Sequence, residues 1–540
     1  MLPDLLEPTP RARLDLVRIE RAMDFAFASA GTFTELDDCL DHIEPLPSPW
    51  DPACFERGLF VRELVQRRFG VEIDGASHEA STKHLIDVLC HPPRDLAVTR
   101  FRQDVLRELG ASEALRRDLE KTYLRMRRFR ALLGPKDASE LSAPERRRMD
   151  VLSTARALID GLATGFEGAT SGLSRLRALG LSIKDSEGYR NVASLLELDR
   201  SLGSVEARMR IGADGTLRAL EIVKVHENTG NALYVPPTRR FWQRLVLWFR
   251  GYVLREPEVR DAVVDQVFTG IRQSLAPVFQ VMGDIEVYLA ALSFRAAAER
   301  QGLAVCLPEM VETPSPGTHA PRHLEALFNP HLLGEAKAPT PCSLAFDRHD
   351  AIAIFTGPNS GGKTRLLQAF ALTQMLGQAG VFVPAARASL VAAEGMFVSL
   401  VEEARPDQRE GRLGTELLRI REVFERLRPG GAVLLDELCS GTNPGEGTEI
   451  FELVTSLLGE LSPQALITTH FLDFAARLEA GSTDGKLVFL QTELDAHSDP
   501  TYQFVPGVAR SSLASKTAER LGVTREALLE LVTKARSLSR

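Results

Sequence analysis

The sequence has few cysteines and no cysteine pair at a metal-binding spacing. Six cysteines are scattered through 540 residues, and no Cys-x-x-Cys motif occurs. Small secreted domains depend on many paired cysteines, and zinc fingers need closely spaced ones. The sequence therefore argues against a disulfide framework and against a cysteine zinc site, and it fits a reducing compartment.

The sequence also has no net positive charge and no long apolar run, and we expect no leader segment. The net charge is -8 and the pI is about 5.9, which argues against a chain that coats nucleic acid but leaves room for a local basic face. No apolar stretch has membrane-spanning length. The start, "MLPDLLEPTPRARLDL", has acids and prolines where a signal peptide needs a basic start and an apolar core. We expect a cytoplasmic protein with no membrane partner.

The first part of the chain reads as helices. With 44% hydrophobic residues, the chain has enough apolar surface for several domains. Residues 1–135 predict a helical core region, and residues 136–238 predict more helix followed by a β-hairpin with an Asp214-Gly215 turn. Residues 239–310 return to long helices, one of which Pro277 is expected to kink.

The last part alternates strands with helices. The proline- and glycine-rich segment "VETPSPGTHAPRHLEALFNPHLLGEAKAPTPCSL" is expected to be a domain boundary. Through residues 325–540, "AIAIFTG", "VFVPA", "AVLLDE", "QALITTHF" and "KLVFLQTE" read as strands between helical runs. This alternation predicts a mostly parallel sheet covered by helices, an α/β domain that follows the all-α region.

A glycine-rich stretch between a predicted strand and a predicted helix matches G-x-x-x-x-G-K-[ST] in full. Glycine allows backbone N–H groups to approach phosphate oxygens, and the start of a helix adds a positive end. Lys363 would reach the β- and γ-phosphates, and the Thr364 hydroxyl would bind Mg²⁺. The alternative, a turn without a ligand, does not explain why strand, loop, Lys-Thr and helix all agree. The predicted ATP-binding loop consists of Gly357, Pro358, Asn359, Ser360, Gly361, Gly362, Lys363 and Thr364.

Two further strand ends carry candidate catalytic residues. "GAVLLDEL" ends a buried strand in acid, so that Asp436 would bind Mg²⁺ and Glu437 would act as the base toward a water. "ALITTHF" ends in His470, which we expect to contact the γ-phosphate. The alternatives are a solvated acidic strand end and a structural histidine.

The motifs "TGPNSGGKT", "VFVPA", "LLDELCSGTNPGEG" and "ITTHFLDFAARL" together resemble the ATPase domain of the MutS family of mismatch-repair proteins. The resemblance implies an ABC-type P-loop ATPase that uses ATP and Mg²⁺ and forms a homodimer through its ATPase domains. It also implies that the upstream helices are the family's core and lever helices, with the clamp reduced to the hairpin. Double-stranded or branched DNA is the implied partner.

The chain also departs from the family pattern. No Phe-x-Glu motif lies in a separate N-terminal domain of the mismatch-reading kind, and the chain stops shortly after the ATPase, so we expect a minimal member without mismatch recognition. The family's Ser-Thr-Phe tripeptide, which reaches across the dimer to the partner's ATP, is matched by Gly414, Thr415 and Glu416. Thr415 alone keeps a hydroxyl for that contact. Cys439 replaces a glycine, and we interpret it as a packing residue.

Two functions of different class remain after these arguments. The first is a MutS-like ATPase that binds DNA by structure or backbone, in repair or recombination. The second is an ATP-gated interaction protein that acts on a protein or ribonucleoprotein, which the acidic charge favours. A transporter-type ATPase is opposed by the Pro-Asn in the loop and by the absence of Leu-Ser-Gly-Gly-Gln.

Overall fold

A computed structural model describes most of the chain. The described residues are 3–28, 35–40, 42–134, 144–201, 204–211, 217–226, 256–315, 318–358, 360–400, 412–439, 443–482, 485–510, 524–529 and 531. They form two compact units. The first comprises Met1–Glu44 with Arg107–Ile285, and the second comprises Pro45–Leu106 with Glu286–Arg540.

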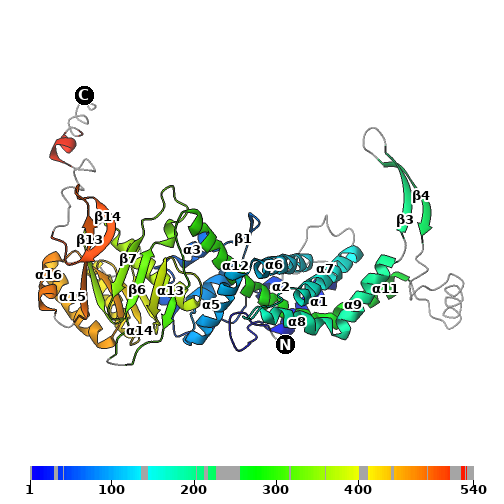
Figure 1. The fold of residues 1–540 in the computed structure, drawn as a ribbon, viewed down its shortest axis with the longest axis horizontal. Helices are drawn as coiled ribbons and strands as arrows, with labels where there is room; N and C mark the ends of the chain where they lie inside the picture. Colours follow the sequence, from blue (N-terminus) through cyan, green and yellow to red (C-terminus); the bar gives the residue numbers. More distant parts are fainter. Residues whose placement is uncertain are drawn as a thin grey trace. The chain divides into compact units, whose positions relative to one another are not determined.

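The first unit is built from helices. Helix α7 packs against α6, α8 and α9, and α11 packs against α9 and α1 (Figure 1). Helix α6 shows why these segments form: Ser112 caps its first turn, and Leu115, Leu119 and Tyr123 bury one face at a spacing of one turn. The helices are α1 (Leu16–Ala28), α2 (Glu35–Leu40), α6 (Glu113–Leu133), α7 (Pro144–Thr164), α8 (Ser174–Lys184), α9 (Glu187–Ser201) and α11 (Glu256–Leu275).

A β-hairpin lies in this unit where the sequence predicts one. Strands β3 (Ser204–Ile211) and β4 (Leu217–His226) pair antiparallel, with Val205 opposite Val225. The predicted Asp214-Gly215 turn lies outside the described residues.

Two long helices contain residues of both units, α5 (Leu96–Ala111) and α12 (Pro277–Arg300). The predicted break at Pro277 is confirmed, since α11 ends at Leu275 and α12 begins at the proline at an angle of 45°. Among the described residues, no single helix is long and apolar enough to cross a bilayer. The bent pair formed by α11 and α12 meets the criteria of length and composition only.

The second unit contains two larger sheets. Within the described residues, one sheet has the order β10-β11-β12-β8-β13-β14, and its neighbours pair in parallel except β13 and β14. The other has the order β5-β9-β6-β7. The strands are β1 (Val71–Ile73), β2 (Ala76–His78), β5 (Glu309–Val311), β6 (Arg322–Leu327), β7 (Cys342–Phe346), β8 (Ile352–Thr356), β9 (Arg387–Val391), β10 (Met396–Ser399), β11 (Ala432–Leu435), β12 (Gln464–Thr468), β13 (Leu487–Leu494) and β14 (Pro500–Pro506).

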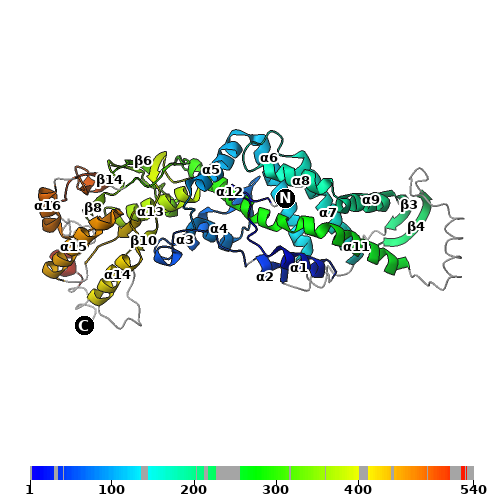
Figure 2. The ribbon, with the colours of Figure 1, turned by 90° about the horizontal axis from the view of Figure 1, so that it is seen from below.

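Helices flank the six-stranded sheet, as the alternation of the sequence predicts. Helix α13 contacts β11 and β12, and α16 contacts β13. Helix α14 contacts β10 (Figure 2). Strand β8 lies between β12 and β13, and all five of its residues are buried. The helices are α3 (Val61–Arg68), α4 (Thr82–Cys90), α13 (Lys363–Ala379), α14 (Arg412–Arg426), α15 (Pro444–Leu458) and α16 (Leu472–Gly481), with short 3-10 turns η1 (Pro52–Cys54), η2 (Pro330–Leu332) and η3 (Gly459–Leu461).

Two expectations about this unit are wrong. "VFVPA" is no strand. Of its residues, Val383 forms an isolated bridge to Cys306. The next residue, Pro384, has no N–H with which to continue the pairing. The proline-rich segment expected to be a boundary instead contains β6, the last residue of β5 and the first three residues of β7. Its prolines fall outside those strands, so the composition misled the prediction.

Candidate functional site

The glycine-rich loop, residues 357–364, joins the carboxyl end of β8 to the start of α13. Gly357 and Gly362 have positive φ angles of 135° and 82°. A Cβ atom at Gly357 or at Gly361 would lie 2.7 Å from Thr492 Oγ1. The loop therefore needs glycine both for its backbone angles and for its close approach to β13.

Lys363 is the first residue of α13, and its side chain folds back over the loop. Its Nζ donates to the carbonyl oxygens of Gly357 and Pro358 at 2.8 and 2.9 Å. Burial lowers the pKa of Lys363, while Glu437 and Asp436 act in the opposite direction. The positive charge of Lys363 and the negative charges of Glu437 and Asp436 therefore interact with one another beside the loop.

Asp436 follows β11 and accepts two hydroxyl hydrogen bonds. Thr364 Oγ1 donates to its Oδ2, and Thr468 Oγ1 donates to its Oδ1, both at 2.6 Å. Asp436 N also donates to Ser399 O at the end of β10, at 2.9 Å. The carboxyl ends of parallel strands meet at one edge of a sheet. At this edge the Asp436 carboxylate lies next to the hydroxyls of Thr364 and Thr468.

Glu437 lies next to this carboxylate in a left-handed turn with a φ of 52°. Its N–H donates to Thr468 Oγ1 at 2.7 Å, which holds the turn. Its Oε1 lies 2.7 Å from His470 Nε2, and both side chains are partly exposed. The left-handed backbone is unusual for a residue with a Cβ and turns Glu437 away from the strand direction.

The amino end of α13 is left open by the protein itself. Gly362 precedes the helix, and among the described residues no side chain caps this end. The first N–H groups of a helix have no partner within it, and with the helix dipole they attract anions. The end of α13 is therefore available to a negatively charged group.

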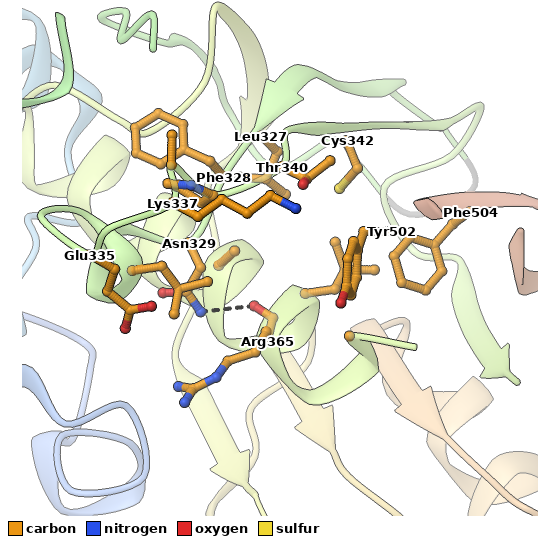
Figure 3. A pocket seen from close by; sticks show the side chains of 16 residues that line it. Leu327, Phe328, Asn329, Glu335, Lys337, Thr340, Cys342, Arg365, Tyr502 and Phe504 are labelled. Carbon is orange, nitrogen blue, oxygen red and sulfur yellow. Dashed lines mark hydrogen bonds between the residues drawn. The ribbon is translucent and has the colours of Figure 1, made fainter. Parts of the chain in front are cut away.

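A pocket of about 290 Å³ adjoins the loop at Gly362 (Figure 3). Tyr502 and Phe504 of β14 form one wall, Phe328 and Leu366 add apolar surface, and Asn329 Nδ2 donates to Arg365 O at 3.0 Å. Aromatic walls with a few polar groups suit a flat heterocyclic ligand.

The residues that form this site also lie in the part of the chain that is similar to known proteins. The sequence profile of MutS domain V matches residues 353–539. Residues 353–539 are therefore a domain of the MutS family. The chain is 27% identical to "Endonuclease MutS2" of Thermomicrobium roseum over 317 residues. This aligned region covers 57% of the chain and 38% of the relative.

Two further MutS2 proteins show the same relationship. "Endonuclease MutS2" of Thermus thermophilus is 32% identical over 186 residues, or 34% of this chain and 25% of the relative. That of Lacticaseibacillus casei is 26% identical over 331 residues, or 60% of this chain and 39% of the relative. The aligned region is thus well under half the length of each relative.

The structure brings together most residues that the sequence singles out. Lys363, Thr364, Asp436, Glu437 and His470 lie at one edge of the six-stranded sheet. Asn359 and the side chain of Thr415 lie outside the described residues.

Three residues of this site are absent from the sequence-based prediction. Thr468 links Asp436 to Glu437, Thr492 lies against the loop, and Tyr502 lines the pocket. Thr468 was within reach of sequence reasoning, because it stands two residues before His470. Thr492 and Tyr502 belong to strands on the far side of β8, and no local motif marks them.

Cys439 adopts a φ of 63° and is buried. Burial raises the pKa of its thiol to about 12, so the thiolate is disfavoured. This agrees with the interpretation of Cys439 as a packing residue.

Proposed function

We propose that this MutS-family chain binds ATP in its glycine-rich loop and hydrolyses it to ADP and phosphate. The observation that carries the proposal is the row of hydrogen bonds from Thr364 through Asp436 and Thr468 to Glu437, beside the loop. A P-loop ATPase requires these functions together: a phosphate cradle, oxygen ligands for a cation, and a base.

The phosphates would be held by the backbone N–H groups of the loop and by Lys363, which exchanges two carbonyl partners for phosphate oxygens. The residues present fit Mg²⁺, since the Thr364 hydroxyl and the Asp436 carboxylate lie 2.6 Å apart and Mg²⁺ takes oxygen ligands. Bound there, Mg²⁺ would neutralise phosphate charge. Glu437 would accept the proton of the attacking water, while His470 holds its carboxylate in place.

The pocket beside the loop would hold the purine base. Tyr502 stands next to Gly362, so a base stacked on its ring would continue from phosphates bound at the loop. Apolar surface from Phe328 and Leu366 would exclude water from the base.

We further propose a homodimer that forms through the ATPase domains and binds double-stranded or branched DNA in repair or recombination. The relatives are named endonucleases, which supports a nucleic-acid partner. Leu417 and Leu418 on α14 and Leu453 on α15 are between 42% and 58% exposed, and a second copy could cover these apolar side chains. Thr415 would face the partner's ATP in such a dimer.

A second candidate is an ATP-gated protein that acts on a protein or ribonucleoprotein partner. The net charge of -8 favours it, because DNA binding gains from basic charge.

The test combines turnover with a DNA titration. Phosphate release from ATP is measured with Mg²⁺ and with a chelator, and we expect activity only with Mg²⁺. Affinity is then measured for matched duplex, single-mismatch duplex and four-way-junction DNA at two salt concentrations, with and without ATP. We expect salt-sensitive binding that a mismatch changes by less than about threefold, under about 1 kcal/mol. No turnover contradicts the ATPase, and turnover without any DNA binding favours the second candidate.

A further inference from the structure

Three possible metal ligands meet at the amino end of β8, the opposite end of that strand from the glycine-rich loop. His349 and Asp350 come just before β8, and His319 comes just before β6. β8 belongs to the six-stranded sheet and β6 to the four-stranded sheet. A group that joins these residues would therefore connect the two sheets of the second unit.

We propose that His319, His349 and Asp350 form a binding site for a divalent transition-metal ion such as Zn²⁺. One ligand atom from each residue lies within 4.8 Å of the other two. Two imidazoles and a carboxylate are a donor set typical of zinc, with water as the fourth ligand. This site is separate from the ATP site and does not depend on it.

The separations are close to those that an ion requires. His319 Nδ1 lies 3.3 Å from Asp350 Oδ1. Ligand distances of about 2.0–2.2 Å at zinc place tetrahedral ligand atoms a little over 3 Å apart, so the widest pair must close by roughly 1–1.5 Å. His319 can supply this movement because its side chain is 38% exposed.

Two of the ligands are fixed by the fold. His349 and Asp350 are 5% and 4% exposed. Arg348 Nε and Nη2 donate to the two carboxylate oxygens of Asp350, each at 2.9 Å, and thus orient it. Metal-binding carboxylates usually have such partners in structures.

The hydrogen bond that His349 accepts is a weak one. The Ala320 N–H points to His349 Nδ1 at 3.5 Å, a long contact that is easily given up.

The nearby cations limit the affinity. Arg348 is paired with Asp350, and Arg322 is buried between the rings of Phe346 and Phe370, with its charge near the same carboxylate. Two guanidinium groups oppose a third positive charge. We therefore expect weaker binding than at an all-cysteine structural site, and binding that competes with the direct contact between His319 and Asp350.

The experiment uses the full chain without an affinity tag, stripped of metal with a chelator and then dialysed. Co²⁺ is titrated as a spectroscopic probe of zinc sites, followed by displacement with Zn²⁺. We expect a saturable visible absorption at one equivalent that Zn²⁺ removes, and a higher thermal transition with Zn²⁺, because the ion joins two sheets.

Variants locate the binding. His319→Ala changes a partly exposed residue, so the fold should persist, and Co²⁺ affinity should fall by at least about tenfold. His323→Ala removes an exposed histidine of β6 outside the cluster and should leave the affinity unchanged. Asp436→Asn removes the proposed Mg²⁺ ligand and should leave the cobalt absorption unchanged. The proposal is overturned if no saturable absorption appears, if His319→Ala binds as the parent does, or if Asp436→Asn abolishes the signal.

Discussion

The two ends of helix α13 are built in opposite ways. At its amino end, among the described residues, no side chain caps the backbone, and Lys363 lies folded on the loop. At its carboxyl end, Arg102 Nη1 donates to Ala379 O and Thr99 Oγ1 donates to Gln378 O, both at 2.9 Å. Gly380 then ends the helix with a φ of 87°.

The difference separates binding from stability along one helix. Backbone groups that the protein satisfies itself, as at the carboxyl end, contribute to the fold and are closed to ligands. Groups that it leaves open, as at the amino end, cost stability but can hold an anion. Substitutions at the amino end should therefore change ATP chemistry, and those at the carboxyl end should change the unfolding temperature.

The largest effect is expected for Lys363→Ala. The substitution removes the positive charge directed at phosphate, so kcat/KM for ATP should fall roughly a thousandfold, as for the loss of one strong transition-state donor together with ground-state binding. The contacts that Lys363 makes are with carbonyls of its own loop, so the thermal transition should hardly move. Phosphate release and circular dichroism measure the two quantities. Parental turnover in a folded variant would contradict the proposed site.

A smaller loss is expected for Glu437→Gln. The amide keeps the size of the side chain but cannot accept the proton, so turnover should fall by about a hundredfold, within the range for general base catalysis. ATP should still bind, and a dimer that persists with Mg²⁺ and ATP should appear on a sizing column. Parental turnover would place the base elsewhere, and a variant that neither binds ATP nor dimerises would show a structural role for Glu437.

These two positions belong to the residues that the sequence assigns to one site and that lie close together in the structure. The loop, Asp436, Glu437 and His470 sit in short motifs at strand ends, and their chemistry requires those residue types locally. The alternation of strand and helix also predicts the parallel sheet correctly. Each of these features depends on neighbours in the sequence, which a single sequence displays.

What the sequence does not predict depends on residues that are distant along the chain. Arg102 and Thr99 bind the last carbonyl groups of a helix that lies far from them along the chain. The separation between Arg102 and Ala379 is 277 residues. Thr492 approaches the loop only because β13 pairs with β8. The β5-β9-β6-β7 sheet was missed because its strands are short and lie between prolines.

The carboxyl end of α13 is tested by Arg102→Met, with Arg100→Met as the matched control on the exposed face of α5. Loss of the Arg102 bond leaves a buried carbonyl without that donor, which costs about 1–3 kcal/mol. At roughly 2–4 °C per kcal/mol for a domain of this size, the thermal transition should fall by several degrees. The control should move it by less than about 1–2 °C, as surface changes do. The KM for ATP should stay within about twofold of the parent. If Arg102→Met instead impairs ATP binding and leaves the unfolding temperature unchanged, the proposed division between the two ends is wrong.

The smallest effect is expected at Thr492. At this side chain a contribution to the stability of the fold can be separated from a contribution to ATP binding. Its Oγ1 is buried and has no hydrogen-bond partner among the described residues, yet it lies against Gly357 and Gly361. A buried hydroxyl without a partner costs stability, so the isosteric Thr492→Val should leave the unfolding temperature unchanged or raise it. If the hydroxyl bonds to the loop when ATP is held there, its loss should raise the KM for ATP by about threefold, as expected for one neutral hydrogen bond. Thermal unfolding and steady-state turnover, measured on the same preparation, test both parts. A lower unfolding temperature would show that the hydroxyl already has a partner in the fold, and an unchanged KM would show that the open end of α13 binds ATP without help from β13.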